Sequence, residues 1–258
     1  MADAAIRVER RGRVVRCTLD RPPLNLFEPG LIAALRSTFV ELAGDATVGV
    51  VVLRGSGRAF TAGMNVNVLR DLDAAGAETL ITTLHDAVDA VHRAPFPVVA
   101  AINGAAAGAG LSIALAADVR VMAQGARITT GYARRGLSPD GGMSWFLPRI
   151  VGATRAADLI LTARDVTAEE ALATGIVAAV YPDESFREDA QAYAAALAAN
   201  APIGMTNSKR LLAESAANSL TTQLKRELTL IRRAFESDDV REGLRAFVEK
   251  RQPVFRGR

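Results

Sequence analysis

Two glycine-containing turns carry backbone groups that could stabilise a developing negative charge. In the first, AFTAGMN, Gly63 lets the chain fold tightly, so that the N–H of Met64 can point outward. The second, NGAAAGAG, places Gly108 and Ala109 at the start of a helical run. A helix start offers unpaired N–H donors and the positive end of the helix dipole, and small side chains let a ligand oxygen approach.

Two amides that meet on one oxygen form an oxyanion hole. It needs no reorganisation during a reaction, and one donor typically contributes on the order of 3 kcal/mol. Acyl-thioester enolates depend on such a hole, because their negative charge develops on the carbonyl oxygen. Taken singly, each turn is explained better as a packing device between a strand and a helix. The chemistry therefore requires that both turns converge.

The elements that must position these turns alternate between strands and helices up to Pro182, which predicts α/β layering. After Pro182 the pattern becomes purely helical. We expect an α/β core over residues 1–182 and a helical region over 183–258, of a kind that often packs on a partner subunit. The expected strands are 6–10, 14–19, 49–53, 97–102, 119–122, 127–130 and 176–180. The expected helices are 29–44, 74–93, 111–117, 184–199, 203–217, 219–236 and 238–250.

Composition narrows the class of protein. The 258 residues are 50% hydrophobic and carry a net charge of +3 with the two signs interleaved, so no stripe for nucleic acid is expected. Basic residues do gather after Arg245, where a solvated tail is the simpler interpretation and a phosphate contact stays open. The single Cys17 lies in a predicted strand and reads as a buried thiol. No apolar leader or membrane-length run is present, which favours a cytoplasmic protein.

Other functional motifs fail. Gly108 and Gly110 begin a dinucleotide fingerprint, but Ile113 occupies the third glycine position. His85 and His92 are seven residues apart on one predicted helix, too far for a two-histidine metal pair. We therefore expect no metal site and no cofactor of this kind.

The turns and their surroundings together resemble the enoyl-CoA hydratase/isomerase (crotonase) superfamily. The resemblance runs from about residue 6 to the end. It rests on LDRPPLN, GRAFTAGMN, PVVAAINGAAAGAGLSIALAADVRV, GLSPDGGMSWFLPRIVG, ALATGIVAAV and EGLRAFVEKRQPVF. It implies a spiral of ββα units with a helical C-terminal trimerisation region, assembled as a homotrimer or a dimer of trimers.

The resemblance also assigns groups in the site. It makes the N–H groups of Met64 and Ala109 the oxyanion donors. Hydratases of the family use two glutamates, and this chain has Ser112 and Tyr132 at the corresponding positions. Hydration by two carboxylates is therefore unexpected here.

Asp140 is the remaining acid/base candidate, because family members that shift a double bond place an acidic residue there. One carboxylate can move a proton between two carbons of an enoyl thioester. A site lined by Leu137, Trp145 and Phe146 would raise the pKa of Asp140. The alternative is that Asp140 caps the following helix, which would lower its pKa.

The resemblance places coenzyme A, as part of the substrate and not as a separate cofactor, against Leu24 and the neighbourhood of Ala62 and Gly108. Phe247 and Lys250 match positions that reach a neighbouring subunit's coenzyme A, although Lys250 alone reads as a solvated helix face. An enoyl-CoA isomerase is the leading interpretation. A hydratase with unusual acid/base groups, a non-catalytic acyl-CoA-binding protein and an RNA-binding protein of this fold remain open, the last disfavoured by the interleaved charges.

Overall fold

The computed structural model describes residues 5–258 and holds two sheets in that range. The predicted core begins with residues 1–4, which lie outside the described range. The larger sheet has the order β1-β2-β3-β5-β7-β10, and the smaller has the order β4-β6-β8-β9. The larger comprises β1 Ile6–Arg11, β2 Val14–Leu19, β3 Val50–Gly55, β5 Val98–Ile102, β7 Val119–Ala123 and β10 Ala179–Tyr181. The smaller comprises β4 Ala59–Thr61, β6 Ala105–Ala107, β8 Arg127–Thr129 and β9 Asp165–Thr167.

A ββα unit repeats along the core. In each unit a longer buried strand (β3, β5 or β7) pairs in parallel in the large sheet, and a short strand (β4, β6 or β8) follows in the small sheet. A helix then returns the chain to the next unit. This is the spiral of ββα units that the resemblance implies. The helices of the core are α1 Pro29–Ala43, α2 Val66–Arg70, α3 Ala74–His92, α4 Ala109–Ala116, α5 Met143–Val151, α6 Ala153–Thr162, α7 Ala168–Ala173 and α8 Phe186–Ala198.

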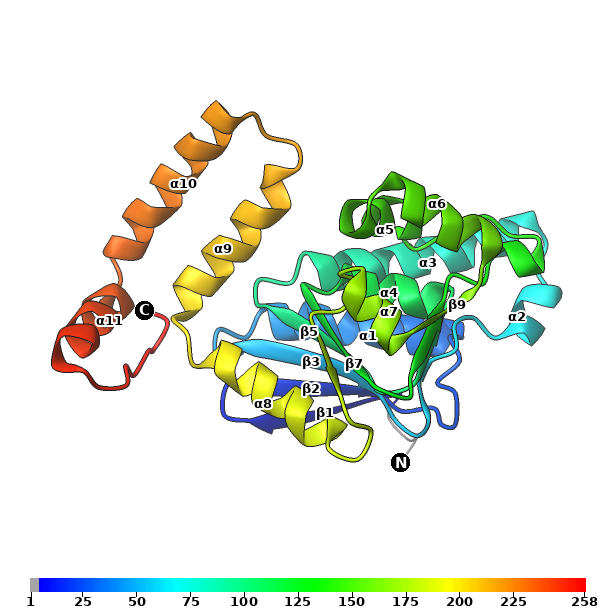
Figure 1. Ribbon diagram of the computed structural model, residues 1–258, viewed down its shortest axis with the longest axis horizontal. Helices are drawn as coiled ribbons and strands as arrows, with labels where there is room; N and C mark the ends of the chain where they lie inside the picture. Colours follow the sequence, from blue (N-terminus) through cyan, green and yellow to red (C-terminus); the bar gives the residue numbers. More distant parts are fainter. Residues whose placement is uncertain (1–4) are drawn as a thin grey trace.

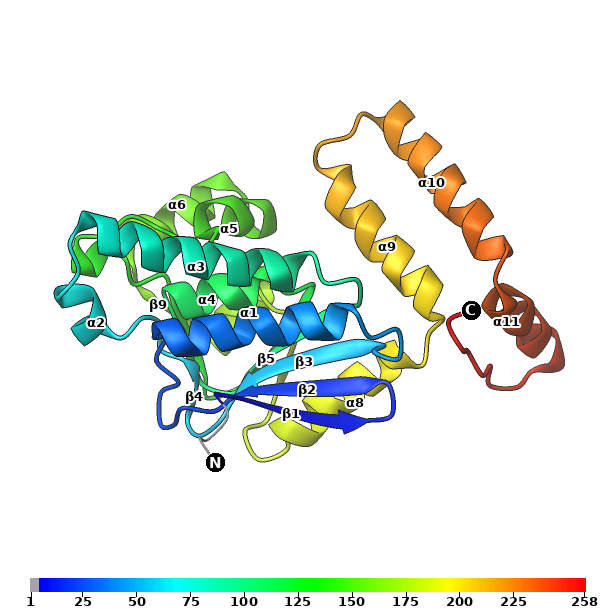
Figure 2. The same ribbon diagram turned by 180° about the vertical axis from the view of Figure 1, so that it is seen from behind.

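Helices cover both faces of the large sheet. Figure 2 shows α1 and α3 in front of the sheet, and Figure 1 shows α8 on the opposite side. Helix α8 contacts β2, β3 and β7, and its buried residues Phe186, Ala190 and Ala194 belong to the main hydrophobic core. The purely helical sequence thus begins before the core ends, because α8 packs on the sheet.

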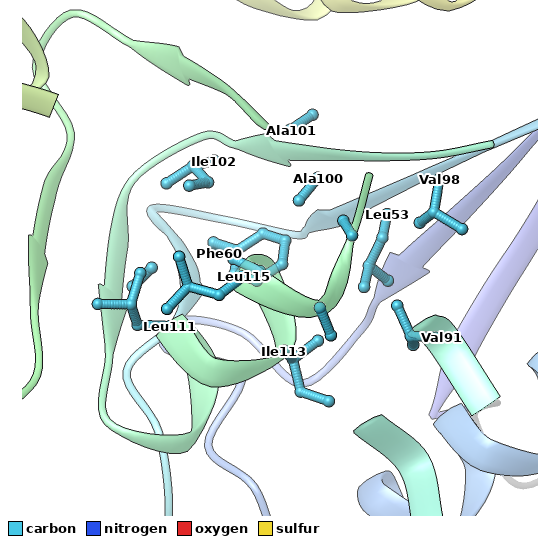
Figure 3. Close-up of a cluster of buried hydrophobic side chains, with 14 of the residues drawn as sticks. Leu53, Phe60, Val91, Val98, Ala100, Ala101, Ile102, Leu111, Ile113 and Leu115 are labelled. Carbon is cyan, nitrogen blue, oxygen red and sulfur yellow. The ribbon is translucent and has the colours of Figure 1, made fainter. Parts of the chain in front are cut away.

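Helix α4 lies inside the core, and all eight of its residues are buried. Figure 3 shows Leu111, Ile113 and Leu115 of α4 beside Phe60 and Leu53, within reach of the strands of the large sheet. A helix buried on every side must be apolar all round, which explains why AGLSIALA lacks a polar face.

Helices α9 Pro202–Ser215, α10 Leu220–Phe235 and α11 Asp238–Glu249 form a lobe that stands away from the core in Figure 1. We call residues 202–258 the C-terminal lobe. The basic residues from Arg245 onward are exposed, as expected of a solvated tail, although the backbone near the chain end is held in place. The buried carboxylate of Asp239 accepts hydrogen bonds from the N–H groups of Arg256 and Gly257, at 2.7 and 2.8 Å.

The predicted elements agree with the structure apart from a few differences. The last core strand begins at Ala179 and not at residue 176, and β4 and β6 were expected to be turns. Cys17 is buried as predicted. Along residues 5–258, no helix is long and apolar enough to cross a membrane.

Candidate active site

The two glycine-containing turns follow neighbouring parallel strands. Strands β4 and β6 pair in parallel, with Thr61 opposite Ala106, so their carboxyl ends lie at the same edge of the small sheet. The buried amide of Asn25 fixes the approach to the first turn, because its Nδ2 donates to the carbonyl oxygens of Ala59 and Phe60 at 2.9 and 3.2 Å. Sheet pairing and this side chain together bring the two turns side by side.

Glycine is required where the turns touch. A Cβ on Gly63, whose φ is +88°, would lie 2.6 Å from the carbonyl oxygen of Ala107 and 3.8 Å from the nitrogen of Ala109. A Cβ on Gly110 would lie 2.6 Å from the carbonyl oxygen of Thr61. The backbones of the two turns are therefore in contact, and no side chain fits between them.

The amides of Met64 and Ala109 are left without protein acceptors. The N–H of Phe27 donates to the carbonyl of Gly63 at 2.8 Å, and the carbonyl of Phe27 accepts from the N–H of Asn65 at 2.9 Å. The N–H of Met64 belongs to the same peptide group as the carbonyl of Gly63 and therefore points away from Phe27. Ala109 is the first residue of α4, where no carbonyl of the same helix is available. Along residues 5–258 neither N–H donates a hydrogen bond.

Both residues line one cavity of about 370 Å³. Its walls come from the two turns, from α2 and α3, and from the segment that precedes α5. The lining residues are Ala62, Gly63, Met64, Val66, Leu69, Ala77, Ile81, His85, Ala107, Gly108, Ala109, Gly131, Tyr132, Arg135, Leu137, Ser138, Pro139 and Asp140. This volume suits a small-molecule site, with mostly apolar walls and a few convergent polar groups.

Asp140 is held by Ser112 and Tyr132, the two residues that the resemblance matches to the glutamates of family hydratases. The hydroxyl of Tyr132 donates to Oδ1 of Asp140 at 2.6 Å. Ser112 donates to the backbone carbonyl of Asp140 at 3.0 Å, and its hydroxyl lies 3.1 Å from that of Tyr132. The three residues form one hydrogen-bonded cluster, of which Tyr132 and Asp140 line the cavity.

The capping alternative for Asp140 is contradicted. Helix α5 begins at Met143, its N-cap is Gly142, and no side chain accepts a hydrogen bond there. Burial instead raises the pKa of Asp140, while the hydrogen bond from Tyr132 and the charge of His85 lower it in part. A carboxylate with a raised pKa is a stronger base once it is ionised.

The predicted substrate-binding residues are divided between several places. Ala62, Gly108 and Leu137 line the cavity with the catalytic candidates. Leu24 accepts a hydrogen bond from the N–H of Ala62 at 3.0 Å but lines a separate depression beside Pro23.

Trp145 lies outside the cavity, contrary to the expectation that it lines the site of Asp140. Its ring meets that of Phe146 edge to face, with 4.9 Å between centroids, and the guanidinium of Arg149 lies over it, 4.0 Å from the ring centroid. Trp145 and Phe146 line a neighbouring hollow that also reaches His85. The reason is that α5 starts at Met143 and turns both rings away from Asp140.

Phe247 and Lys250 lie on and just after α11 in the C-terminal lobe, and Phe247 is exposed. They do not line the cavity of their own chain.

His85 and Arg135 are lining residues that sequence reasoning did not select. His85 faces the cavity from α3, and Arg135 donates to the carbonyl of Gly131 at 3.0 Å. No local pattern marks either residue. Within the described range there is no group of three or more side chains suited to a metal ion.

Comparison with known proteins identifies the family of the chain. The sequence model of the enoyl-CoA hydratase/isomerase family matches residues 9–258, so the chain belongs to this family of acyl-CoA enzymes. A probable enoyl-CoA hydratase of Rhodobacter capsulatus is 38% identical, with all of both chains covered. The 1,2-epoxyphenylacetyl-CoA isomerase of Escherichia coli is 35% identical over 95% of both chains.

The fold agrees with solved structures of the family. The crystal structure of an enoyl-CoA hydratase from Bacillus anthracis superimposes with a TM-score of 0.96 at 31% identity. It covers 98% of this chain and 100% of that one. The names of the relatives include both hydratase and isomerase.

Proposed function

We propose that this protein shifts the double bond of an enoyl-CoA, with Asp140 as the acid/base. The carboxylate removes a proton from the α carbon of a 3-enoyl thioester, and the electron pair moves to the thioester oxygen. The amides of Met64 and Ala109 hold the resulting dienolate. The carboxyl group then returns the proton to the γ carbon as the α,β double bond forms, so no other reactant is consumed.

One observation carries the proposal: among the described lining residues, Asp140 is the one carboxylate. An isomerisation needs a single group that first accepts and then returns one proton. Hydration by two carboxylates needs a second one. Ser112 and Tyr132, which stand at the glutamate positions, bind to Asp140.

A hydratase is the second candidate, favoured by the names of relatives such as the 2,3-dehydroadipyl-CoA hydratase of Escherichia coli, 32% identical. In that case Asp140 would deprotonate a water molecule. The coenzyme A part of either substrate would extend past Ala62 toward Leu24, and no separate cofactor is required. Lys250 of a neighbouring copy would meet its phosphate groups, as a cation suited to phosphate.

The test is to incubate the protein separately with a 3-enoyl-CoA and a 2-enoyl-CoA and to identify the products. The proposal predicts positional isomerisation that Asp140→Ala abolishes. Rapid hydration that survives this substitution would remove Asp140 from the mechanism. Tight binding of both thioesters without turnover would mean a non-catalytic acyl-CoA-binding protein.

A further inference from the structure

A second, strongly basic cavity lies on the face of the large sheet that α8 covers. Its volume is about 180 Å³, and four arginines line it. The strands β1 to β3 supply three of them, and the first turn of α8 supplies the fourth, beneath the helix that Figure 1 shows in front of the sheet. The lining residues are Arg7, Glu9, Arg16, Thr18, Arg54, Ser56, Gly57 and Arg187. None of these residues lines the acyl cavity.

The strand register explains why these side chains meet. Arg7 is opposite Thr18 in the β1-β2 ladder, and Thr18 is opposite Arg54 in the β2-β3 ladder. Residues opposite each other point to the same face, and neighbouring strands lie about 4.8 Å apart, so the arginine backbones are about 10 Å apart. Long side chains can cross that span, with the hydroxyl of Thr18 between them. Arg187, in the first turn of α8, closes the cavity on the side of that helix.

Positive charge in this cavity exceeds negative charge. Glu9 is the one carboxylate among the described lining residues, and Arg16 binds both of its oxygens at 2.6 and 3.1 Å. Arg54 donates to the backbone carbonyl of Gly55 at 3.2 Å. Along residues 5–258, the side chain of Arg187 has no hydrogen bond or ion pair.

The like charges are close enough to act on each other. The pKa of Arg54 is lowered, first by its burial and then by the charges of Arg187, Arg16 and Arg7, while the charge of Glu9 offsets this in part. Outside the cavity Arg7 has the carboxylate of Asp20, at 3.7 Å. An anion placed between the guanidinium groups would offset this repulsion.

We propose that the arginine cavity binds a small phosphate-type oxyanion. Guanidinium forks match phosphate oxygens in pairs, and the Thr18 hydroxyl supplies a further donor. The volume of about 180 Å³ accommodates such an ion. The ion is inorganic phosphate or the phosphate of a molecule other than the substrate. Coenzyme A is the alternative source that the test must separate, because a Cβ on Gly57 would lie 3.4 Å from Cβ of Pro22, which lines the depression beside Leu24.

Calorimetric titration with inorganic phosphate at constant ionic strength tests the proposal. The wild type is expected to bind one phosphate with a Kd of about 1 mM or tighter. Arg54→Gln and Arg187→Gln should each weaken binding at least about tenfold. The matched control is Arg11→Gln, which removes one charge from the same strand as Arg7 without touching the cavity. Its Kd should stay within about twofold of the wild type.

Two further measurements separate the alternatives. Without phosphate, Arg54→Gln should unfold at the wild-type temperature or above it, because a repulsion is removed; phosphate should stabilise only the wild type and the control. A titration with coenzyme A should give the same Kd for the wild type and Arg54→Gln. The proposal fails if the wild type shows no saturable binding of phosphate, or if Arg54→Gln binds phosphate as well as the control does. A loss of coenzyme A affinity in Arg54→Gln would assign the cavity to the substrate and would also overturn it.

Discussion

The core, residues 5–198, and the C-terminal lobe use the same helical spacing of apolar residues with different results. In the core, α1 and α3 bury their apolar faces within the chain. In the lobe, α9 has no buried residue, and α10 buries only Leu230 and Ala234. A stripe of large apolar side chains on α10 stays exposed at spacings of four and three residues: Leu220, Leu224, Leu228, Ile231 and Phe235.

This difference separates what a single chain can form by itself, the candidate active site, from what needs a second surface, the burial of α10. The amides of Met64 and Ala109, Asp140 and its hydrogen-bond partners all lie in the core and are positioned without the lobe. The stripe on α10 has the pattern of a buried helix but lacks a covering surface in the described chain. We infer that a second copy of the chain covers it, in the trimer or pair of trimers expected for the family.

The largest expected effect tests whether the chemistry belongs to the core. Asp140→Asn should lower the rate of double-bond isomerisation by about 10²–10⁴-fold, because the acid/base group is lost. The same change in the lobe, Asp238→Asn, should leave the rate unchanged, since this carboxylate pairs with Arg241 at the surface. Equal losses in both variants would contradict the division.

Asp140→Asn should also unfold at the same temperature as the wild type or higher. Burial raises the pKa of Asp140, so its charged form is disfavoured in the folded state. The stability that this group contributes is present while it is protonated and is lost as pH rises through the raised pKa. The stabilising effect of the substitution should therefore be greater at neutral pH than near pH 4.

Core packing can be compared with the lobe directly through two phenylalanines. Phe60 is 0% exposed and Phe235 is 61% exposed. Phe60→Ala should lower the free energy of unfolding by about 3–5 kcal/mol, the usual cost of a cavity. Phe235→Ala should change it by less than about 0.5 kcal/mol in dilute, dissociated protein. Denaturant unfolding at low concentration measures both, and similar losses would show that the lobe supports the core.

The assembly of chains, unlike the stability of one chain, should depend on the exposed side chains of the lobe. Leu228→Glu places a charge in the exposed stripe of α10 and should reduce the mass measured by light scattering to that of one chain, with the helical content kept. The control is Leu161→Glu, at a residue of α6 that is 75% exposed against 68% for Leu228. A wild type that is already a single chain, or a Leu228→Glu protein of unchanged mass, would remove the proposed second copy.

A smaller change is expected from the partner of Asp140. The hydrogen bond from Tyr132 lowers the pKa of Asp140, so Tyr132→Phe should raise it further. Because the base must be ionised, the acid limb of kcat/KM should move to higher pH, while the rate above that limb changes little. Tyr193→Phe on α8, away from the cavity, is the control and should keep the profile. An unchanged limb in Tyr132→Phe would mean that another group titrates.

How tightly the core is closed can be tested at Cys17. Burial raises the pKa of Cys17 to about 12. At pH 8 its thiolate should be on the order of 10³-fold less abundant than that of an ordinary thiol, so a thiol reagent should label it only after unfolding. In Val8→Cys, at the position opposite Cys17 on β1, the exposed thiol should react at once. Rapid labelling of Cys17 in the folded protein would show that the sheet opens.

The sequence predicted those parts of the fold that depend on local pattern. The β-branched run of β3 and the apolar repeat of α1 occur where expected. Strands β4 and β6 were not predicted, because three residues each of AFT and AAA are too short to show alternation. Their pairing with each other defines them as strands.

The site was predictable in its backbone and less so in its side chains. The glycines of both turns indicate where the chain must approach itself closely. The contact between Tyr132 and Asp140 joins residues eight positions apart across an irregular segment, and no periodic pattern in the sequence predicts it. The hydrogen bond that the N–H of Gly257 donates to Asp239, 18 residues away, was missed for the same reason, since only the tertiary fold brings the two together.

The burial of α4 has a consequence for how this protein can change. The helix that begins with the amide of Ala109 runs through the middle of the hydrophobic core. Because it is packed on every side, it cannot shift without moving its neighbours. A substitution that shifts its neighbours Phe60 or Leu53 would also displace the amide of Ala109, the proposed donor to the substrate. Thermal stability and turnover should therefore vary together in this region, and mutants selected for one will carry changes in the other.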